Sequence, residues 1–117
     1  MSEGDRTPAP PGRRLDQWLW FARLVKSRSL AARLCAAGAV TLNGVAIRKS
    51  NHMVRVGDAV VAPQGAYLRR VRVLGLGSRR GPAAEARLLY EETAAPAPLV
   101  EFAPVWEPLL AEGEPES

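Results

Sequence analysis

The sequence contains one cysteine, Cys35, and one histidine, His52, in 117 residues. A lone cysteine cannot form a disulfide within the chain, and one cysteine plus one histidine at unrelated spacing cannot supply the ligands of a structural zinc site. The same scarcity argues against a cysteine–histidine nucleophile pair. We therefore expect no metal, no cofactor and no catalytic thiol, and we expect Cys35 to be an ordinary core or surface residue.

Long apolar runs are missing as well. No stretch approaches the roughly 20 apolar residues that a membrane-spanning helix needs. Residues 1–5 are polar and acidic and lead into prolines, whereas a secretion signal is basic and then apolar. We therefore expect a soluble cytoplasmic protein with no membrane partner, and 117 residues leave little room for more than one domain.

Acidic residues are scarce in the middle of the chain. Residues 13–80 contain 14 Lys and Arg but only two acids, Asp16 and Asp58, which gives a local charge of +12. Residues 81–117 contain eight Glu and one Arg, so the net charge of the whole chain is only +4. A basic body of this kind indicates a polyanionic partner. The alternative is a solvated basic surface that binds nothing specific.

The basic body begins with two helical patterns. The first, over residues 15–26, carries an apolar stripe made of Leu15, Trp18, Leu19, Ala22 and Val25. The second begins with Ser27 or Ser29 as its N-cap and ends at Gly38. Its inward-facing residues are Leu30, Ala31, Leu34 and Ala37. Because only a short basic turn separates the two helices, we expect them to pack as a pair.

After the second helix the apolar period becomes two, which indicates strands. Residues 40–42 and 45–47 flank Asn43-Gly44, the pattern of a hairpin with a type I′ turn. Further strands are predicted at residues 54–56, 59–61 and 67–76, the first two forming a second pair around Gly57-Asp58. The strands together predict a small antiparallel sheet.

The remaining elements complete an α+β architecture. Pro82 begins an Ala- and Leu-rich stretch, which we interpret as a short helix near residues 82–92, because proline suits a first helical position. Eight of the ten prolines lie in residues 1–12 and 94–117, so we expect two mobile segments around a domain at residues 13–93. The fold predicted is two packed N-terminal helices on a small antiparallel sheet, with one more helix.

Many of the cations fall around the predicted helix pair and hairpin. If the helices pack on the sheet, one surface can be lined by Arg13, Arg14, Arg23, Lys26, Arg28, Arg33, Arg48 and Lys49. The planar fork of arginine can grip a phosphate with two hydrogen bonds and can stack on bases. The N-terminus of the second helix would add backbone donors near Arg28. Such a surface suits a nucleic acid.

One long pattern spans both helices and the hairpin. It consists of Arg14-Leu-Asp-Gln-Trp-Leu-Trp-Phe-Ala-Arg23, Lys26-Ser-Arg28-Ser-Leu-Ala-Ala-Arg33, Gly38, Val40, Asn43-Gly44 and Val56-Gly57-Asp58. This pattern resembles the RNA-binding domain of the ribosomal-protein-S-four type (the S-four domain). Within that superfamily the chain looks most similar to the small heat-shock, ribosome-associated proteins that bind free large ribosomal subunits. The run from Arg79-Arg80-Gly-Pro82 to Thr93 is similar to that subgroup too.

The resemblance implies an αL-motif fold that holds RNA across the helix–helix joint and the hairpin. The positions that match are Arg14, Arg23, Lys26, Arg28, Arg33, Asn43, Gly44 and Lys49, and Arg48 joins them as the neighbour of Lys49. Proteins of the subgroup associate with stalled large subunits that keep a nascent chain on transfer RNA, and are thought to help recycle them. The chain departs from the subgroup after Thr93, where Pro, Ala and Glu replace a long basic helical tail.

Some of these residues have a second interpretation. Trp20 lies outside the apolar stripe, so it either stacks on a base or covers the joint between the helices. Asp16 is a cap or a salt-bridge partner that orients an arginine. Asn43-Gly44 is first of all a turn, with RNA contact as an additional role. Arg48 and Lys49 protect a sheet edge or, as we favour, contact phosphates.

Residues 75–81 form a Gly- and Arg-rich segment that invites comparison with a phosphate-binding loop. The segment lacks the Gly-Lys-Ser/Thr ending of that motif, so we do not expect nucleotide-triphosphate binding. We interpret it as a basic turn that leads into a helix and makes at most a secondary RNA contact.

The function predicted is that of a non-catalytic RNA-binding protein. It would dock, as a monomer, on structured ribosomal RNA of the free large subunit, with peptidyl-tRNA as a further partner, and act in rescue or recycling of stalled subunits under heat stress. The acidic segment 91–117 would fold over the basic face and compete with RNA. One alternative is an RNA-modifying enzyme, because S-four domains also precede pseudouridine synthase domains, although 117 residues leave no room for that catalytic domain. Another is a general binder of DNA or of acidic protein surfaces.

Overall fold

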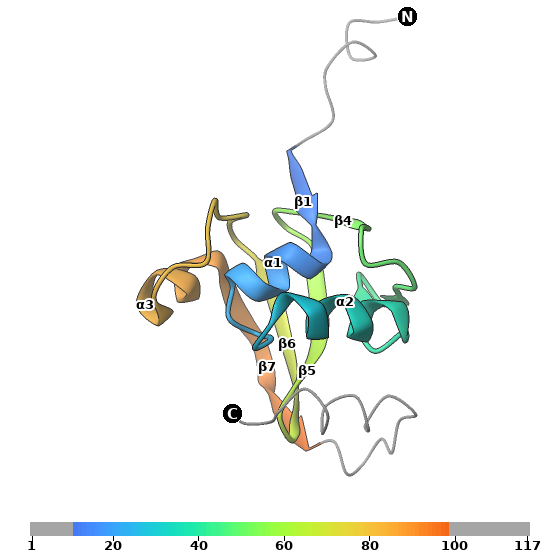
Figure 1. Ribbon diagram of the computed structural model, residues 1–117. Helices are drawn as coiled ribbons and strands as arrows, with labels where there is room; N and C mark the ends of the chain where they lie inside the picture. The colour runs from blue at the N-terminus through green and yellow to red at the C-terminus, as the bar shows by residue number, and fades with distance from the viewer. Residues whose placement is uncertain (1–10, 99–117) are drawn as a thin grey trace, which may run out of the picture.

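Two helices lie across one face of an antiparallel sheet in the computed structural model, which describes residues 11–98 (Figure 1). The helices are α1 (Leu15–Phe21), α2 (Arg28–Ala36) and α3 (Ala83–Ala86), followed by a 3-10 turn, η2 (Arg87–Leu89). The strands are β1 (Gly12–Arg14), β2 (Thr41–Leu42), β3 (Val45–Ala46), β4 (Met53–Arg55), β5 (Ala59–Gln64), β6 (Tyr67–Val73) and β7 (Tyr90–Pro98). The predicted α+β class, with its packed helix pair, is confirmed.

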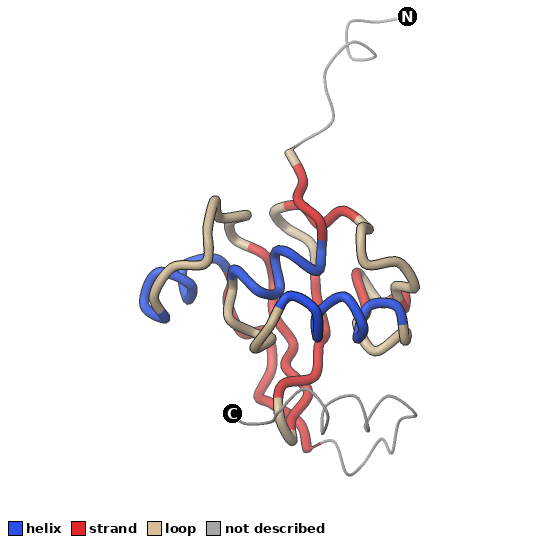
Figure 2. Tube along the Cα trace, viewed as in Figure 1, coloured by secondary structure: helices blue, strands red, loops and turns tan. Residues whose placement is uncertain are grey.

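The strands, red in Figure 2, form two sheets, and every strand pair is antiparallel. The larger has the order β3-β2-β5-β6-β7, and the smaller pairs β1 with β4. The hairpin prediction is confirmed, because Asn43 (φ 53°) and Gly44 (φ 87°) both adopt the positive φ of a type I′ turn. The predicted pairing of β4 with β5 is wrong. β4 pairs with β1, which the sequence did not predict, and β5 lies between β2 and β6.

The core lies between the helix pair and the larger sheet. The apolar stripe of the first helical pattern is buried as predicted, with Leu15, Trp18 and Leu19 fully inaccessible. Trp18 also donates its indole N–H to the carbonyl oxygen of Gly75 at 2.8 Å, so its one polar atom is satisfied. From the sheet, Val60 and Val71 pack into the same cluster. Because this core fixes the positions of α1 and α2, it also fixes where the charged side chains of these helices lie.

The first helix is shorter than predicted, because it ends at Phe21 rather than near residue 26. Arg23 has a left-handed backbone (φ 60°), and the amides of Arg23 and Leu24 donate to the carbonyls of Trp20 and Leu19 at 3.1 and 3.0 Å. This is a Schellman motif, which usually places glycine at the left-handed position. Arginine at this position does not signal a helix end. The apolar periodicity, which includes Val25, therefore predicts a helix that is longer than α1.

The second helix begins and ends as predicted. The Ser27 hydroxyl oxygen accepts a hydrogen bond from the Leu30 amide at 3.1 Å, so Ser27 is the N-cap. At the other end Gly38 (φ 80°) takes the left-handed position of a second Schellman motif, in which the amides of Gly38 and Ala39 donate to Cys35 and Leu34. Both signals, serine and glycine, are ones that sequence alone can reveal.

The C-terminal part of the described chain differs most from prediction. The helix expected near residues 82–92 is limited to α3 and η2, and β7 then runs to Pro98, so the sheet includes residues assigned to the tail. Pro96 and Pro98 suggested a loose segment, but β7 is the outer strand of its sheet, where proline is tolerated. Residues 1–10 and 99–117, where mobile ends were predicted, lie outside the described residues.

Candidate nucleic-acid interface

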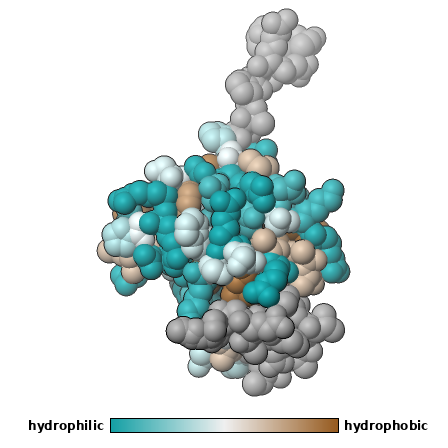
Figure 3. All heavy atoms as spheres, in the orientation of Figure 1, coloured by the Kyte–Doolittle hydropathy of each residue, from teal (hydrophilic) through white to brown (hydrophobic). Residues whose placement is uncertain are grey.

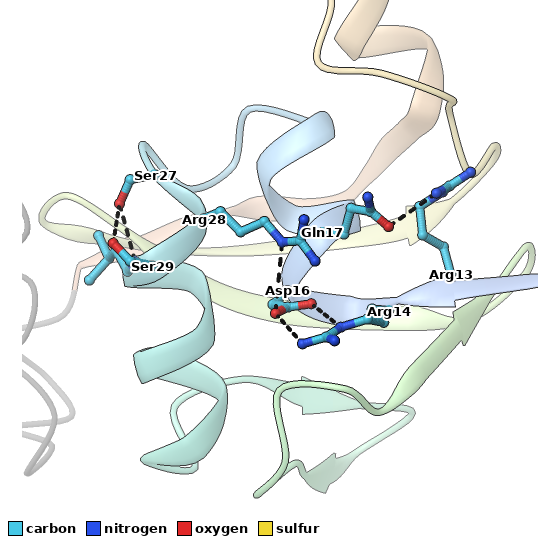
Figure 4. A network of polar contacts seen from close by, with 8 residues as sticks. Arg13, Arg14, Asp16, Gln17, Ser27, Arg28 and Ser29 are labelled. Carbon is cyan, nitrogen blue, oxygen red and sulfur yellow. Dashed lines mark hydrogen bonds and ion pairs between the residues drawn. The ribbon is translucent and has the colours of Figure 1, made fainter.

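Asp16 is the one buried charged residue in the described part of the chain, at 2% exposure. Its carboxylate accepts hydrogen bonds from Nε and Nη2 of Arg14, at 3.1 and 3.0 Å, and lies 4.0 Å from Nε of Arg28 (Figure 4). The hydrogen bonds and the negative charge of Asp16 raise the pKa of Arg14. The salt-bridge interpretation of Asp16 is therefore confirmed, and this acid joins β1 to the first residue of α2.

Both arginines keep a large part of their surface in solvent. The side chain of Arg14 is 45% exposed and that of Arg28 is 41% exposed, although each is directed toward Asp16. A guanidinium has five N–H donors, so donors remain on each after the contact with Asp16. The arrangement presents two oriented cations at the joint between α1 and α2. Arg13 lies to one side, where it donates to Gln17 at 3.1 Å and covers the Phe21 ring.

A second group of cations lies at the turn between α1 and α2. Arg23 donates from Nε to the carbonyl of Gly81 at 2.7 Å, and Arg80 donates from Nη1 to the carbonyl of Lys26 at 3.3 Å. Arg80 also lies over the Trp20 ring, 5.4 Å from its centroid. Two residues of the segment 75–81, Arg80 and Gly81, thus contact the helix joint. The Trp20 ring therefore lies beneath Arg80, beside this turn.

Arg80 is the charged residue that sequence reasoning did not include in the candidate set. The sequence carries only a partial signal for Arg80: residues 75–81 form a Gly- and Arg-rich segment, and Trp20 lies outside the apolar stripe. Nothing in the sequence joined the two, because they are far apart in the chain and meet only through tertiary packing. We define the helix-joint surface as Arg14, Arg23, Lys26, Arg28 and Arg80. Asp16 joins Arg14 to Arg28, Arg80 contacts Lys26, and residues 26–28 of the turn link these two groups along the chain.

Arg48 and Lys49 begin a loop that runs from the end of α2 to the start of α1. The guanidinium of Arg48 lies against Gly38 at the end of α2, where a side-chain Cβ would come within 2.8 Å of Cζ. A cation is favourable beside a helix C-terminus. The loop then reaches the start of α1, where the amide of Leu15 donates to the carbonyl of His52 at 2.7 Å. Lys49, within this loop, is exposed.

Two other predicted residues are in a different environment. The side chain of Asn43 donates to Asp58 at 3.1 Å and accepts from the Ala59 amide at 2.9 Å, so it holds the hairpin to the start of β5. Gly44 is exposed at the tip of the turn, and a side-chain Cβ there would meet nothing within 4 Å. Among the described contacts, none brings Asn43 or Gly44 to the helix-joint surface. Arg33 is exposed on α2.

The face that carries α1 and α2 is covered largely by hydrophilic residues (Figure 3). Cys35, by contrast, is fully buried beneath this face, and burial, followed by the negative charge of Asp16, raises the pKa of its thiol to about 12. The thiol is therefore a core group rather than a nucleophile. Between residues 11 and 98, no group of three or more His, Cys, Asp and Glu is arranged to hold a metal ion. None of the helices described there could cross a membrane.

Comparison with known proteins relates this geometry to a family. Residues 13–60 match the S4 domain, which is the S-four type. Over 81 residues, or 69% of the chain, the sequence is 43% identical to heat shock protein 15 of Escherichia coli, of which it covers 60%. Over 78 residues, or 67% of the chain, it is 36% identical to the RQC P-site tRNA stabilizing factor of Halalkalibacterium halodurans, of which it covers 86%.

A solved structure shows the same fold. The trimeric structure of heat shock protein 15 from Vibrio cholerae superimposes with a TM-score of 0.67 and 37% sequence identity, covering 72% of this chain and 84% of that one. The matched region of the Escherichia coli relative is 60% of its length, so that relative contains a substantial part with no counterpart in the alignment. The shared part includes the helix pair and the hairpin.

Proposed function

The chain belongs to the S4 domain family, and from this we propose that it is a non-catalytic RNA-binding protein that docks on structured ribosomal RNA. The observation that carries the proposal is the Asp16 contact. A buried carboxylate holds two half-exposed arginines, Arg14 and Arg28, at the joint of two packed helices. An acid that orients exposed cations in this way is what a fixed phosphate-binding surface requires.

The proposed mechanism combines charge and shape. Arginine and lysine neutralise backbone phosphates and release the counterions that surround RNA, which supplies affinity. The rigid helix pair and the loop from Arg48 to His52 then restrict binding to an RNA junction of matching shape. If about six phosphates are contacted, the logarithm of the affinity falls with the logarithm of salt concentration at a slope of about −4 to −5.

For the site, we propose the nine residues that sequence analysis selected, together with Arg80. Arg14, Arg23, Lys26, Arg28 and Arg80 would contact phosphates directly. Arg48 and Lys49 would extend the contact along the loop beside α2, and Arg33 would add a charge on that helix. For Asn43 and Gly44 we propose a structural contribution first, because the Asn43 amide is already engaged with Asp58 and Ala59.

For the partner, we propose the large ribosomal subunit, with a transfer RNA that still carries a nascent chain. Support comes from the names of the relatives, one a heat shock protein and one a factor that stabilises P-site tRNA. Rescue or recycling of stalled subunits under heat stress follows as the proposed role. RNA modification is the second candidate and general DNA binding is the third.

Sedimentation tests the partner directly. Lysate from cells that produce the protein is separated on a sucrose gradient, with and without ribonuclease treatment, and each ribosomal peak is probed. The proposal expects the protein in the large-subunit peak and its loss from that peak after ribonuclease. Equal affinity for ribosomal RNA, transfer RNA and duplex DNA at one salt concentration would favour the third candidate, and new pseudouridine in ribosomal RNA would favour the second.

A further inference from the structure

A cavity of about 290 Å³ opens between the turn that joins α1 to α2 and the turn that joins β5 to β6. It is lined by residues 23–26, Leu30, residues 63–65 and Arg80. Residues 63–65 and Arg80 lie beyond residue 60, so this cavity is completed by parts of the chain outside the S4 domain match. Its volume is near the lower end of the range of about 300–1,000 Å³ that small-molecule sites occupy.

The cavity has a mixed polar and apolar lining, with cations at its rim. Leu24, Val25 and Leu30 are all buried, at 1%, 4% and 2% exposure, and Pro63 is buried beside them. Arg23 and Lys26 are exposed at the rim. A cavity of this kind, with cations at its edge, suits a ligand that places an anionic group at the rim and a flat ring inside.

The two arginines at the rim, Arg23 and Arg80, carry like charges in close proximity. Burial and then the charge of Arg23 lower the pKa of Arg80, so each guanidinium raises the energy of the other. The Nε atom of Arg80 is buried and has no hydrogen-bond partner among the described residues. An anion between the two guanidinium groups would offset the repulsion and accept from donors that are not otherwise used.

The backbone of Arg23 is strained in a way that serves this arrangement. A left-handed conformation is unfavourable for arginine by about 1–2 kcal/mol relative to glycine, yet Arg23 adopts φ 60°. The conformation is held because Gln64 donates to the Arg23 carbonyl at 3.2 Å, while Arg23 itself donates to Gly81. These contacts direct a cation to the cavity where a glycine would serve the turn better.

We propose that this cavity receives one unpaired nucleotide of the bound RNA. Its phosphate lies between the guanidinium groups of Arg23 and Arg80, and its base enters the cavity between residues 24–26 and residues 63–65. The proposal rests on the RNA-binding function proposed above and adds the kind of RNA feature that is selected. Unpaired bases can be turned out of a helix and packed on a protein surface, whereas paired bases cannot.

The test compares two RNA hairpins that differ by one bulged uridine in an otherwise fully paired stem. Their affinities for the full-length protein are measured by fluorescence anisotropy at one salt concentration. The wild-type protein is expected to bind the bulged hairpin about tenfold more tightly, the value of a charge-assisted hydrogen bond. Arg80→Gln is expected to bind the two hairpins equally, because the phosphate loses one of its two guanidinium partners.

Arg79→Gln is the matched control. Arg79 is the neighbour of Arg80, carries the same charge and is more exposed, but it pairs with Glu85 at 3.0 Å and does not line the cavity. This variant is expected to keep the preference for the bulged hairpin. Amide NMR shifts give a second measurement, in which the bulged hairpin is expected to move the Gly65 signal at the cavity mouth in the wild-type protein and less in Arg80→Gln.

The outcomes separate the two proposals. Equal binding of both hairpins by the wild-type protein, or a preference that survives in Arg80→Gln, overturns the nucleotide site and leaves the RNA-binding function standing. A preference that both arginine variants lose equally also overturns it, because a general charge effect would then explain the result. Failure to bind either hairpin or any ribosomal RNA fragment overturns both proposals together.

Discussion

Arg14 donates two hydrogen bonds to the carboxylate of Asp16, two residues along the chain, at 3.1 and 3.0 Å. The acid is buried and the arginine is exposed, so the pair is more than a surface ion pair. The same carboxylate faces Arg28 across the helix joint. A single buried charge therefore sets the positions of two cations from separate elements.

Replacing Asp16 with Asn tests this relationship. Asp16→Asn removes the negative charge and one acceptor, so the melting temperature is expected to fall by several degrees. RNA affinity is expected to fall too, even though the net charge of the protein becomes more positive, because Arg14 and Arg28 lose their common anchor. Thermal unfolding and anisotropy titration with ribosomal RNA measure the two effects.

Glu85→Gln is the control for that variant, since it changes the net charge equally. Glu85 is exposed and pairs with Arg79, which is not part of the helix-joint surface. Its loss is expected to change stability by about 0.5 kcal/mol or less and to leave RNA affinity the same or slightly higher. If Asp16→Asn behaves like Glu85→Gln, then net charge alone governs binding.

Arg23 and Gly38 take the same position in two Schellman motifs, so they form a natural comparison. Gly38→Ala is expected to destabilise the fold by about 1–2 kcal/mol because of its left-handed backbone, and by more because its Cβ would meet Arg48. Arg23→Gly should relieve similar strain while losing the bond to Gly81, so its stability should change by about 1 kcal/mol or less in either direction. Urea denaturation measures both values.

In RNA binding, by contrast, the larger effect is expected from Arg23→Gly. Arg23→Gly removes a cation of the helix-joint surface and is expected to weaken binding about tenfold. A stable Arg23→Gly protein with wild-type affinity would exclude Arg23 from the RNA contact. Such a result would also show that the strained arginine serves the fold alone.

The raised pKa of Cys35 makes stability depend on alkaline pH. The thiol has a pKa of about 12 in the folded protein, against 9.0 as its ordinary value. Between these values the unfolded chain has lost the thiol proton and the folded chain has kept it, so stability falls as pH rises. Cys35→Ala is expected to show a shallower loss of stability above pH 9 than the wild type, and equal slopes would contradict the buried, protonated thiol.

Removal of residues 99–117 tests whether the acidic segment competes with RNA. The family resemblance ends near Thr93, but a cut there would divide β7, whose Glu91 and Glu92 already pair with Arg72 and Arg69. A truncation that leaves β7 whole must therefore end at Pro98. We expect the protein ending at Pro98 to bind RNA more tightly than the full chain at low salt, with the difference shrinking as salt is added.

A protein that ends at Thr93 is the control for loss of sheet structure, and it is expected to be less stable than one that ends at Pro98. No gain in affinity after truncation at Pro98 would show that residues 99–117 do not screen the helix-joint surface. Circular dichroism during heating, followed by titration with RNA, distinguishes these effects.

Sequence predicts best those elements whose signals are local. The Ser27 cap, the Gly38 stop and the Asn43-Gly44 turn can all be found, because each depends on the chemistry of one or two residues. The end of α1 is missed because arginine occupies a position at which glycine is the usual signal. β1 and β7 are missed because their pairing with β4 and β6 is decided by tertiary packing, which no local pattern reveals.

The residues of the candidate site also fall into two groups: those that the sequence predicts, and those whose contacts only the folded chain reveals. Arg14, Lys26 and Arg28 are brought to the helix joint as the helical spacing suggested. The turn at Asn43 forms as predicted, but the Asn43 side chain holds the start of β5, a contact that its neighbours in sequence do not indicate. Arg80 lies more than fifty residues after Lys26, and only the folded chain brings the two into contact.

The central claim is that cations at the joint of α1 and α2 form one RNA-binding surface. The salt dependence of binding to ribosomal RNA measures it most directly, in the wild-type protein and in the double variant Lys26→Ala and Arg28→Ala. Arg72→Ala with Arg87→Ala provides a matched control, because both of its residues are exposed on β6 and η2. The wild-type slope is expected to be about −4 to −5. The helix-joint variant is predicted to make this slope shallower by about two units, while the control keeps the wild-type slope. An unchanged slope in the helix-joint variant, or an equal change in the control, would contradict the claim.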